Sequence, residues 1–142
     1  MPPKEDSPRY SGGCLCGQVR YQVDAAPLNT EYCHCSMCRR ASGAPVLGFA
    51  SFPASALVWL AGAPREYVSS PGAWRGFCPN CGGALTFRST EGPARIAITL
   101  GSLDDPASLP PRQHIFEADR IAWLNIADSL PRYAADTPPQ SG

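Results

Sequence analysis

The fold is decided by two short cysteine motifs, GGCLCGQ at residues 12–18 and FCPNCGG at residues 77–83. Each motif holds a close pair of cysteines followed directly by glycine, Gly17 in the first and Gly82 in the second. A thiolate knuckle needs a sharp turn that lets backbone N–H groups face the sulfurs, and glycine permits the positive φ of such a turn. Four thiolates can close a tetrahedral structural zinc site. The four candidate ligands are Cys14, Cys16, Cys78 and Cys81.

Because the two pairs lie far apart in the chain, a shared ion would join the start of the domain to its middle. The binding energy of such an ion becomes folding energy. Disulfides are disfavoured because seven cysteines cannot all pair and because a cytosolic compartment keeps thiols reduced. Ordinary reduced cysteines packed in a core remain the alternative, against which the paired spacing and the two glycines argue.

The other three cysteines lie in the motif CHCSMCRR at residues 33–40. Three protein ligands leave a fourth position on zinc open for water or substrate, as in catalytic sites. Ser36 can donate a hydrogen bond there, and Arg39 and Arg40 supply positive charge that would attract a substrate carboxylate. The motif therefore predicts a catalytic zinc ion that is labile. Its predicted ligands are Cys33, Cys35 and Cys38.

Other arrangements of this motif stay open at the level of the sequence. A second closed site would take its fourth ligand from His34, His114 or an acidic residue. On an extended chain, however, His34 would point away from the cysteines on either side of it, which favours a supporting or packing role. His114 is interpreted as a structural histidine. An iron–sulfur cluster is also conceivable, although the two histidines are far apart and do not match a Rieske pattern.

Composition limits the class of protein. A chain of 142 residues predicts one domain with a modest core. Twelve basic and twelve acidic side chains cancel and are scattered, which argues against nucleic acid or an anionic membrane as partner. Residues 1–8 hold no apolar stretch typical of a secretory signal, and no run approaches the length of a membrane span. We therefore expect a cytoplasmic protein.

Short strands dominate the expected secondary structure. Sixteen prolines and thirteen glycines favour many strands joined by turns over long helices. Apolar residues alternate with polar ones, or form short runs, in six segments, namely residues 19–23, 45–52, 56–60, 66–68, 85–88 and 95–100. Short helical turns are expected at residues 36–42 and 103–108. The sequence thus predicts a mainly β domain at residues 10–134, between disordered tails at 1–9 and 135–142.

With these motifs placed, the chain resembles the glutathione-dependent formaldehyde-activating enzyme family, which includes centromere protein V. The resemblance is carried by three stretches, GGCLCGQVRY at 12–21, CHCSMCR at 33–39 and FCPNCG at 77–82. Weaker matches follow at GSLD 101–104, HI 114–115, WL 123–124 and DSLPRY 128–133. The matching stretches extend from about residue 10 to residue 133.

The resemblance implies a single-domain, Mss4-like, tent-shaped β fold with two zinc ions. It assigns the structural zinc to the two outer cysteine pairs and the catalytic zinc to the central triplet, the same division that the spacing suggests. It also implies a carbon–sulfur lyase activity, in which formaldehyde is joined to glutathione to give S-(hydroxymethyl)glutathione. The expected partners are then a glutathione-like thiol and a small aldehyde.

Two hypotheses of function follow. The first is a zinc-dependent enzyme that acts at the open three-cysteine site on a thiol and an aldehyde. The second is a zinc-stabilised β scaffold that binds a protein or nucleic acid without catalysis. A closed second site with no cavity beside it would favour the scaffold. Under the enzyme hypothesis we expect Trp123 to line the substrate cavity, whereas Arg75 is expected at the surface.

Overall fold

The computed structural model describes residues 9–137, which contain ten short strands, one α-helix and four 3-10 helices. The strands are β1 (Tyr10–Gly13), β2 (Arg20–Val23), β3 (Asn29–Cys33), β4 (Leu47–Pro53), β5 (Leu57–Ala61), β6 (Arg65–Ser70), β7 (Ala73–Phe77), β8 (Ala84–Ser89), β9 (Arg95–Thr99) and β10 (His114–Ile115). The helices are α1 (Ser36–Ser42), η1 (Ala54–Ala56), η2 (Leu100–Ser102), η3 (Pro106–Ser108) and η4 (Glu117–Asp119). The expected mainly β class is confirmed. In the described part of the chain no helix is long and apolar enough to cross a membrane.

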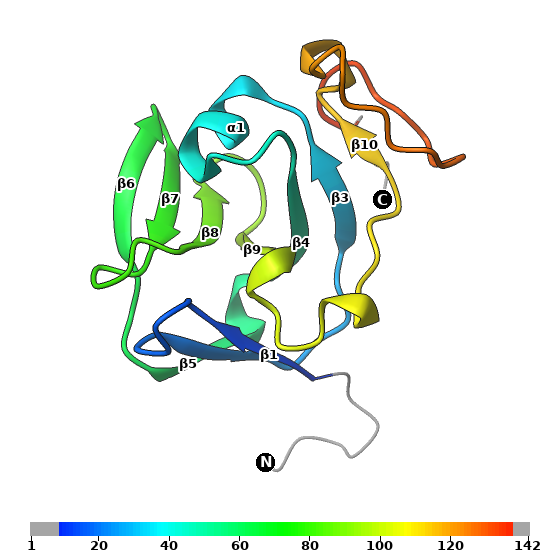
Figure 1. Cartoon of the computed structure of the whole chain (residues 1–142). Coiled ribbons are helices and arrows are strands. Elements are labelled where there is room, and N and C mark those ends of the chain that lie inside the picture. Colours follow the sequence, from blue (N-terminus) through cyan, green and yellow to red (C-terminus); the bar gives the residue numbers. More distant parts are fainter. Residues whose placement is uncertain (1–8, 138–142) are drawn as a thin grey trace.

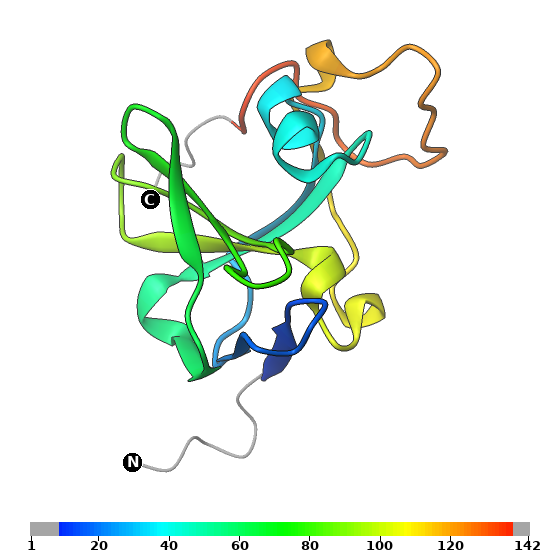
Figure 2. The same cartoon turned by 60° about the vertical axis from the view of Figure 1, so that its left-hand side comes forward.

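The strands form two sheets. The smaller sheet has the order β1-β2-β5, and the larger has the order β10-β3-β4-β9-β8-β7-β6. All pairings are antiparallel except that of β10 with β3. The smaller sheet lies below the larger one, and the segment after β10 lies beyond the β10 edge of the larger sheet (Figures 1 and 2). Residues far apart in the chain therefore meet beside β3 and β10.

The main core lies between the two sheets. In and beside β2 the predicted alternation holds, because Val19, Tyr21 and Val23 are almost completely buried. They pack with residues of the larger sheet such as Phe52 and Ile98. An alternating strand with one buried face is the expected result when a sheet packs on another layer.

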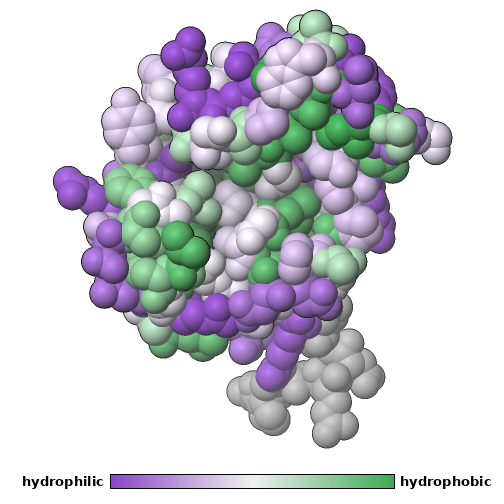
Figure 3. Space-filling model, in the orientation of Figure 1, coloured by the Kyte–Doolittle hydropathy of each residue, from purple (hydrophilic) through white to green (hydrophobic). Residues whose placement is uncertain are grey.

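The opposite face of the larger sheet lines a cavity of about 580 Å³. The strand register places one row of side chains on this face, running across five strands from β3 to β7. The row consists of Asn29, Ser51, Ala97, Phe87 and Arg75, and all five line the cavity. Figure 3 shows the side of the molecule on which α1 and η2 lie, where the surface is also hollowed, with white and green residues inside the hollow.

One strand departs from the expected simple alternation. In β8, Leu85 and Phe87 were expected to share a face, but Leu85 belongs to the main core and Phe87 lines the cavity. The reason is a register irregularity in the β7–β8 pairing between Gly76 and Phe77. A bulge inserts an extra residue and turns the following side chains to the other face.

The helical turns agree with the sequence in part. The α-helix α1 has the bounds predicted for the first turn, and Gly43 ends it with a φ of 74°. The second turn is shorter than predicted and is limited to η3. The predicted tails fall largely outside the described residues. Ala135 belongs to the predicted C-terminal tail and is described by the structure. Its carbonyl oxygen accepts a hydrogen bond from the N–H of Phe116 at 3.0 Å.

Candidate metal centres and active-site cavity

The two outer cysteine pairs meet in space. Cys14 and Cys16 lie in the loop between β1 and β2, and Cys78 and Cys81 lie in the loop between β7 and β8. All four sulfurs are within 4.8 Å of one another, with 3.6 Å between Cys14 and Cys16 and 3.7 Å between Cys16 and Cys78. Two thiolates on one tetrahedral zinc ion, each about 2.3 Å from the metal, are about 3.8 Å apart. This donor set therefore fits zinc.

Backbone N–H groups surround these sulfurs, as a zinc knuckle requires. The N–H of Val19 donates to Cys14 Sγ at 3.3 Å, and the N–H groups of Asn80 and Cys81 each donate to Cys78 Sγ at 3.4 Å. The Val19 hydrogen bond is the main cause that lowers the pKa of Cys14 to about 6. A lowered pKa favours the thiolate form, which is the form that binds metal.

The turns at these loops have the predicted conformation. Gly17 has a φ of 81° and Gly82 has a φ of 77°, and a Cβ atom at either position would be strained because L side chains rarely adopt such angles. All seven cysteines of the chain are free thiols in the structure.

The central triplet lies at the junction of β3 and α1. Cys33 ends β3, Cys35 caps α1 by accepting from the N–H of Met37, and Cys38 lies one turn into the helix. The sulfurs of Cys33 and Cys38 are 2.9 Å apart, and both residues are only 4% exposed. This distance is shorter than the ~3.8 Å of two thiolates on zinc. The two sulfurs are in direct contact and form a hydrogen bond with each other.

The charge of this pair is set by its neighbours. The hydrogen bond with Cys33 and the nearby guanidinium of Arg75 lower the pKa of Cys38 to about 6. The same hydrogen bond, together with burial, raises the pKa of Cys33. One negative charge is therefore favoured on Cys38, where a metal cation or a cationic side chain can neutralise it.

The cation beside the triplet comes from an unexpected strand. Arg75, on β7, places its two terminal nitrogens 3.7 and 3.6 Å from Cys38 Sγ and stacks over the ring of Phe87 at 5.0 Å. The expectation that Arg75 is a surface residue is wrong. Neither Ser36 nor Arg39, which the sequence placed at the site, lines the cavity.

The cavity beside the triplet combines apolar and charged walls. Phe49, Phe87 and Ile115 supply apolar surface next to the cysteines. Further along the same face lie the carboxylate of Glu31 and the guanidinium of Arg95. Burial raises the pKa of Glu31 because the cavity wall removes water from its carboxylate. Trp123 is 70% exposed and lines neither this cavity nor its neighbour, so the expectation that it is a wall residue is wrong.

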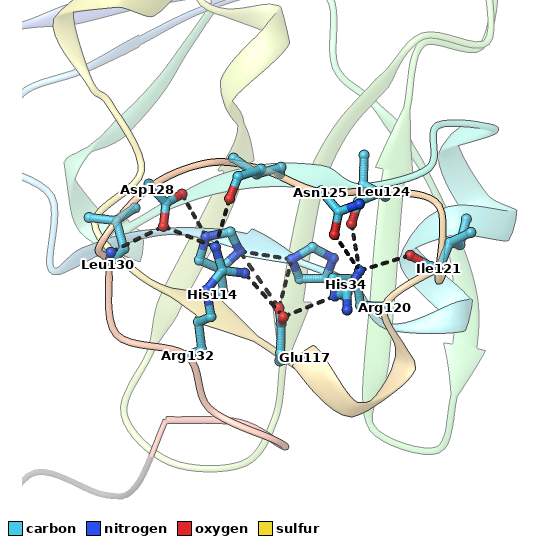
Figure 4. A network of polar contacts seen from close by, with 11 residues as sticks. His34, His114, Glu117, Arg120, Ile121, Leu124, Asn125, Asp128, Leu130 and Arg132 are labelled. Atoms are coloured by element: carbon cyan, nitrogen blue, oxygen red, sulfur yellow. Dashed lines mark hydrogen bonds and ion pairs between the residues drawn. The ribbon is translucent and has the colours of Figure 1, made fainter.

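Behind the triplet, two histidines form the centre of a buried polar network (Figure 4). Both His34 and His114 are fully buried, and their Nε2 and Nδ1 atoms are 2.8 Å apart. His114 Nε2 lies 2.8 Å from Asp128, whose carboxylate can only accept, so this nitrogen donates. In a neutral ring, His114 Nδ1 then accepts from His34. The structural role expected for His114 agrees with this arrangement.

Glu117 connects this histidine pair to two arginines. One carboxylate oxygen, Oε1, accepts from Arg120 at 3.1 Å and from Arg132 at 3.0 Å. The other, Oε2, is buried without a hydrogen-bond partner and lies 3.3 Å from His34 Nε2. The network thereby holds the segment after β10 against the start of α1.

His34, His114 and Glu117 also place their ligand atoms within 4.8 Å of one another, close enough to be considered for a metal ion. The histidine nitrogens, however, are 2.8 Å apart, whereas two histidines on tetrahedral zinc are about 3.3 Å apart. The two arginines on Glu117 also oppose a further cation. A hydrogen-bonded network explains this cluster better. Because both ring nitrogens of His114 have partners, His114 is not available as the fourth ligand of the central triplet.

The sequence analysis did not predict several residues of the cavity and of the buried network. Arg75 and Glu31 belong to strands whose register with their neighbours decides that they share a face with Cys33, and one chain alone does not give that register. Asp128 and Arg132 lie in the stretch at residues 128–133 that resembles the family, and this resemblance was the available signal for a role at the site. Nothing in the sequence indicated that Glu117 contacts His34.

A model of one protein family, described as glutathione-dependent formaldehyde-activating enzyme, matches residues 9–119. The chain belongs to this family. The match includes both outer cysteine pairs, the central triplet and the histidine pair.

Individual relatives of the formaldehyde-activating enzyme family agree with this assignment. A "putative glutathione-dependent formaldehyde-activating enzyme" of Halomonas elongata is 30% identical over 128 residues, which cover 81% of this chain and 79% of that protein. An "uncharacterized lyase" of Schizosaccharomyces pombe is 32% identical over 85 residues, 60% of this chain and 61% of that protein. The chain thus spans about three fifths of the length of the yeast relative.

A crystal structure of a Rhodobacter sphaeroides protein has a similar fold, with a TM-score of 0.54 and 28% identity. The alignment covers 66% of this chain and 87% of the other. The predicted mainly β, Mss4-like single-domain fold is confirmed.

Replacing Cys78 with serine tests the outer cluster as a metal site that folds the domain. We expect the variant to lose one equivalent of zinc and to be unfolded at room temperature. Structural zinc contributes about 10–16 kcal/mol in small domains, which is as large as the whole stability of a typical domain. Circular dichroism and metal analysis by mass spectrometry measure both effects. An unchanged melting curve and zinc content would contradict this role.

Replacing Glu117 with glutamine tests the buried network. The change keeps the shape but leaves Arg120 without a carboxylate and Arg132 with that of Asp128 alone. We expect a loss of about 1–3 kcal/mol in the free energy of unfolding. Glu66→Gln is the matched control, because Glu66 accepts from Arg88 in an exposed pair that is worth less than about 1 kcal/mol. Urea unfolding at constant zinc compares the two. Equal losses in both variants would show that the network adds no stability.

Proposed function

We propose that the protein is a zinc-dependent lyase-type enzyme that joins a small thiol of the glutathione class to a small aldehyde such as formaldehyde. The observation that carries the proposal is the gathering of three cysteines at one end of a cavity large enough for such substrates. The three are Cys33, Cys35 and Cys38. Membership of the formaldehyde-activating enzyme family and the name of the Halomonas relative support the same class of substrates.

The proposal includes two zinc ions. The outer cluster holds one that stabilises the fold, and the central triplet holds another beside the cavity. The second ion supplies a Lewis acid that lowers the pKa of a thiol and so favours its nucleophilic thiolate form. The contact between Cys33 and Cys38 would have to lengthen by about 0.9 Å to accept the ion. The three sulfurs are not all within 4.8 Å of one another, so Cys35 would also have to move toward the other two.

The reaction is an addition without a change of oxidation state. The thiol sulfur forms one bond to the aldehyde carbon, and the thiol proton ends on the former carbonyl oxygen. The protein binds the two reactants side by side, which removes the entropic cost of their encounter during the step. Phe49, Phe87 and Ile115 limit water at this end of the cavity, and this strengthens the electrostatic interactions there.

Arg75 is the residue of the chain that balances the charge of the site. Three thiolates on Zn²⁺ carry a net charge near −1, and the guanidinium of Arg75 faces Cys38 from the cavity side. Its stack over Phe87 fixes the plane of the guanidinium, so its N–H groups stay directed at the sulfur. A site with less negative charge retains more of the electrophilic character that the addition needs.

The alternative of a scaffold that binds without catalysis required a closed second site with no cavity beside it. The triplet instead borders a cavity of about 580 Å³. His114, a candidate for the fourth ligand, is hydrogen-bonded to His34 and Asp128 and is not available to close the site. These observations favour the enzyme.

Replacing Cys35 with serine tests the catalytic assignment. We expect loss of the labile zinc ion and at least a hundredfold lower rate of S-(hydroxymethyl)glutathione formation, because a required metal ligand is removed. The fold should be kept, since Cys35 is half-buried and outside the outer cluster. Formation of the adduct is followed by NMR with glutathione and formaldehyde above the uncatalysed rate. Full activity in this variant, or unfolding equal to that of Cys78→Ser, would contradict the division of roles.

Replacing Arg75 with glutamine tests the charge-balancing role. We expect kcat/KM to fall by about ten- to a hundredfold, the range for loss of one charge-assisted hydrogen bond near a reacting group. Arg75→Lys should restore part of the activity. Arg88→Gln is the control on the same cavity, because Arg88 is already paired with Glu66 and stacked on Trp74. An equal fall in both glutamine variants would show that Arg75 has no special role.

A further inference from the structure

The cavity extends from the cysteine triplet along β3 to a buried carboxylate. Cys33 and Glu31 are two residues apart on this strand and therefore point to the same face. Their Cα atoms are about 7 Å apart, since a strand rises about 3.3–3.4 Å per residue. Both side chains line the cavity. A ligand whose sulfur lies at the triplet can thus contact Glu31 through a polar group that is about this far from the sulfur.

Glu31 is unusual among the carboxylates of the cavity because it is only 8% exposed. One of its oxygens, Oε2, accepts from the side-chain amides of Asn29 at 3.1 Å and Gln113 at 2.9 Å. Both donors are neutral. Among residues 9–137 no arginine, lysine or histidine nitrogen lies within 4.0 Å of this carboxylate. Burial is the main cause that raises the pKa of Glu31, while Asp136 also raises it and Arg95, which lies beyond this distance, lowers it through its charge. A buried carboxylate without a cation in direct contact is costly, and a cationic ligand would reduce that cost.

The amides of Asn29 and Gln113 hold the carboxylate in place from one side. Gln113 is itself fixed by a 2.7 Å hydrogen bond to Thr137 Oγ1. A carboxylate that is oriented in this way before binding loses little entropy when it pairs with a ligand. The exposed guanidinium of Arg95 lies at the same end of the cavity and is available for a carboxylate of the ligand. The charges at this end therefore complement an amino-acid zwitterion.

We propose that Glu31 binds the primary ammonium group of the thiol substrate. This inference rests on the proposed function and names the chemical class that the cavity selects, a thiol whose ammonium group lies well removed from its sulfur. Glutathione has this form, because its free amine is at the far end of the γ-glutamyl residue. Free cysteine does not, because its amine is on the carbon next to the one that bears the sulfur. Glu31 is thus a specificity-determining residue and takes no part in bond formation.

The test compares glutathione with N-acetylglutathione, in which the ammonium group is a neutral amide. Isothermal titration calorimetry on the zinc-loaded protein gives both dissociation constants, and initial rates with formaldehyde give both KM values. We expect the wild-type protein to bind glutathione about tenfold more tightly or better, the usual effect of a hydrogen bond between charged groups. In Glu31→Gln we expect this ratio to approach one, through weaker binding of glutathione with an unchanged kcat.

Glu91→Gln is the matched control, since Glu91 also lines the cavity but is exposed, and its ratio should stay at the wild-type value. The glutamine at position 31 keeps an oxygen that accepts from Asn29 and Gln113. Should this variant nevertheless unfold, Glu31→Asp, which withdraws the carboxylate by one methylene, serves in its place, with a reduced ratio expected. Equal affinities for the two thiols in the wild type, or an unaltered ratio in the Glu31 variants, would overturn the inference.

The outcomes separate this inference from the proposed reaction. A preference for glutathione that depends on Glu31, without turnover of any thiol, would support the ammonium site and refute the lyase reaction. Turnover of both thiols with equal KM would support the reaction and refute the ammonium site.

Discussion

The structure depends on the meeting of the two outer cysteine pairs. Cys14 and Cys16 lie in the loop that joins two strands of the smaller sheet, and Cys78 and Cys81 lie in a loop that joins two strands of the larger sheet. Cys78 is completely buried and packs in the core that both sheets share. A metal ion on these four sulfurs would therefore fix the position of one sheet on the other. In a chain of 142 residues with a modest core, this link would replace apolar contacts that a larger domain has.

Successive side chains at the end of β3 and just after it point in opposite directions. Neighbouring residues therefore serve two different purposes, lining the cavity and supporting it from behind. Cys33 and Cys35 line the cavity, whereas His34 between them points into the network with His114. The network is anchored on Glu117 and Asp128, so it ties the segment after β10 to the back of the cysteine triplet. The position of the triplet is thus supported from the side that a substrate does not reach. Such support limits the movement of side chains that would have to hold a metal in one geometry under the proposed function.

The sequence was sufficient to predict those features that depend on residues close together in the chain. Two cysteine pairs with glycine after each predicted one cluster, and the four sulfurs are indeed together. The helix α1 and six of the ten strands, namely β2, β4, β5, β6, β8 and β9, were located because alternation, apolar runs and turn residues are local signals. The strands β1, β3, β7 and β10 were not predicted. The cation at the site was misplaced for a physical reason. Arg39 is next to Cys38 in the chain, yet a helix directs successive side chains about 100° apart, and Arg75 reaches the sulfur from another strand.

The opening of the triplet toward the cavity follows from topology and residue size. β3 and β4 are antiparallel neighbours, so the chain between them must reverse, and α1 does this while carrying Cys38 back to Cys33. The same reversal would close the site if bulky side chains filled the adjoining face of the sheet. The row on that face instead has Ser51 and Ala97 at its centre, between Asn29 and Phe87. Small residues at the centre of a row flanked by larger ones leave a hollow, because packing cannot compensate for the missing volume across a rigid sheet. The space of the cavity is therefore a property of the sheet, and the cysteine motif alone supplies only one end of its lining.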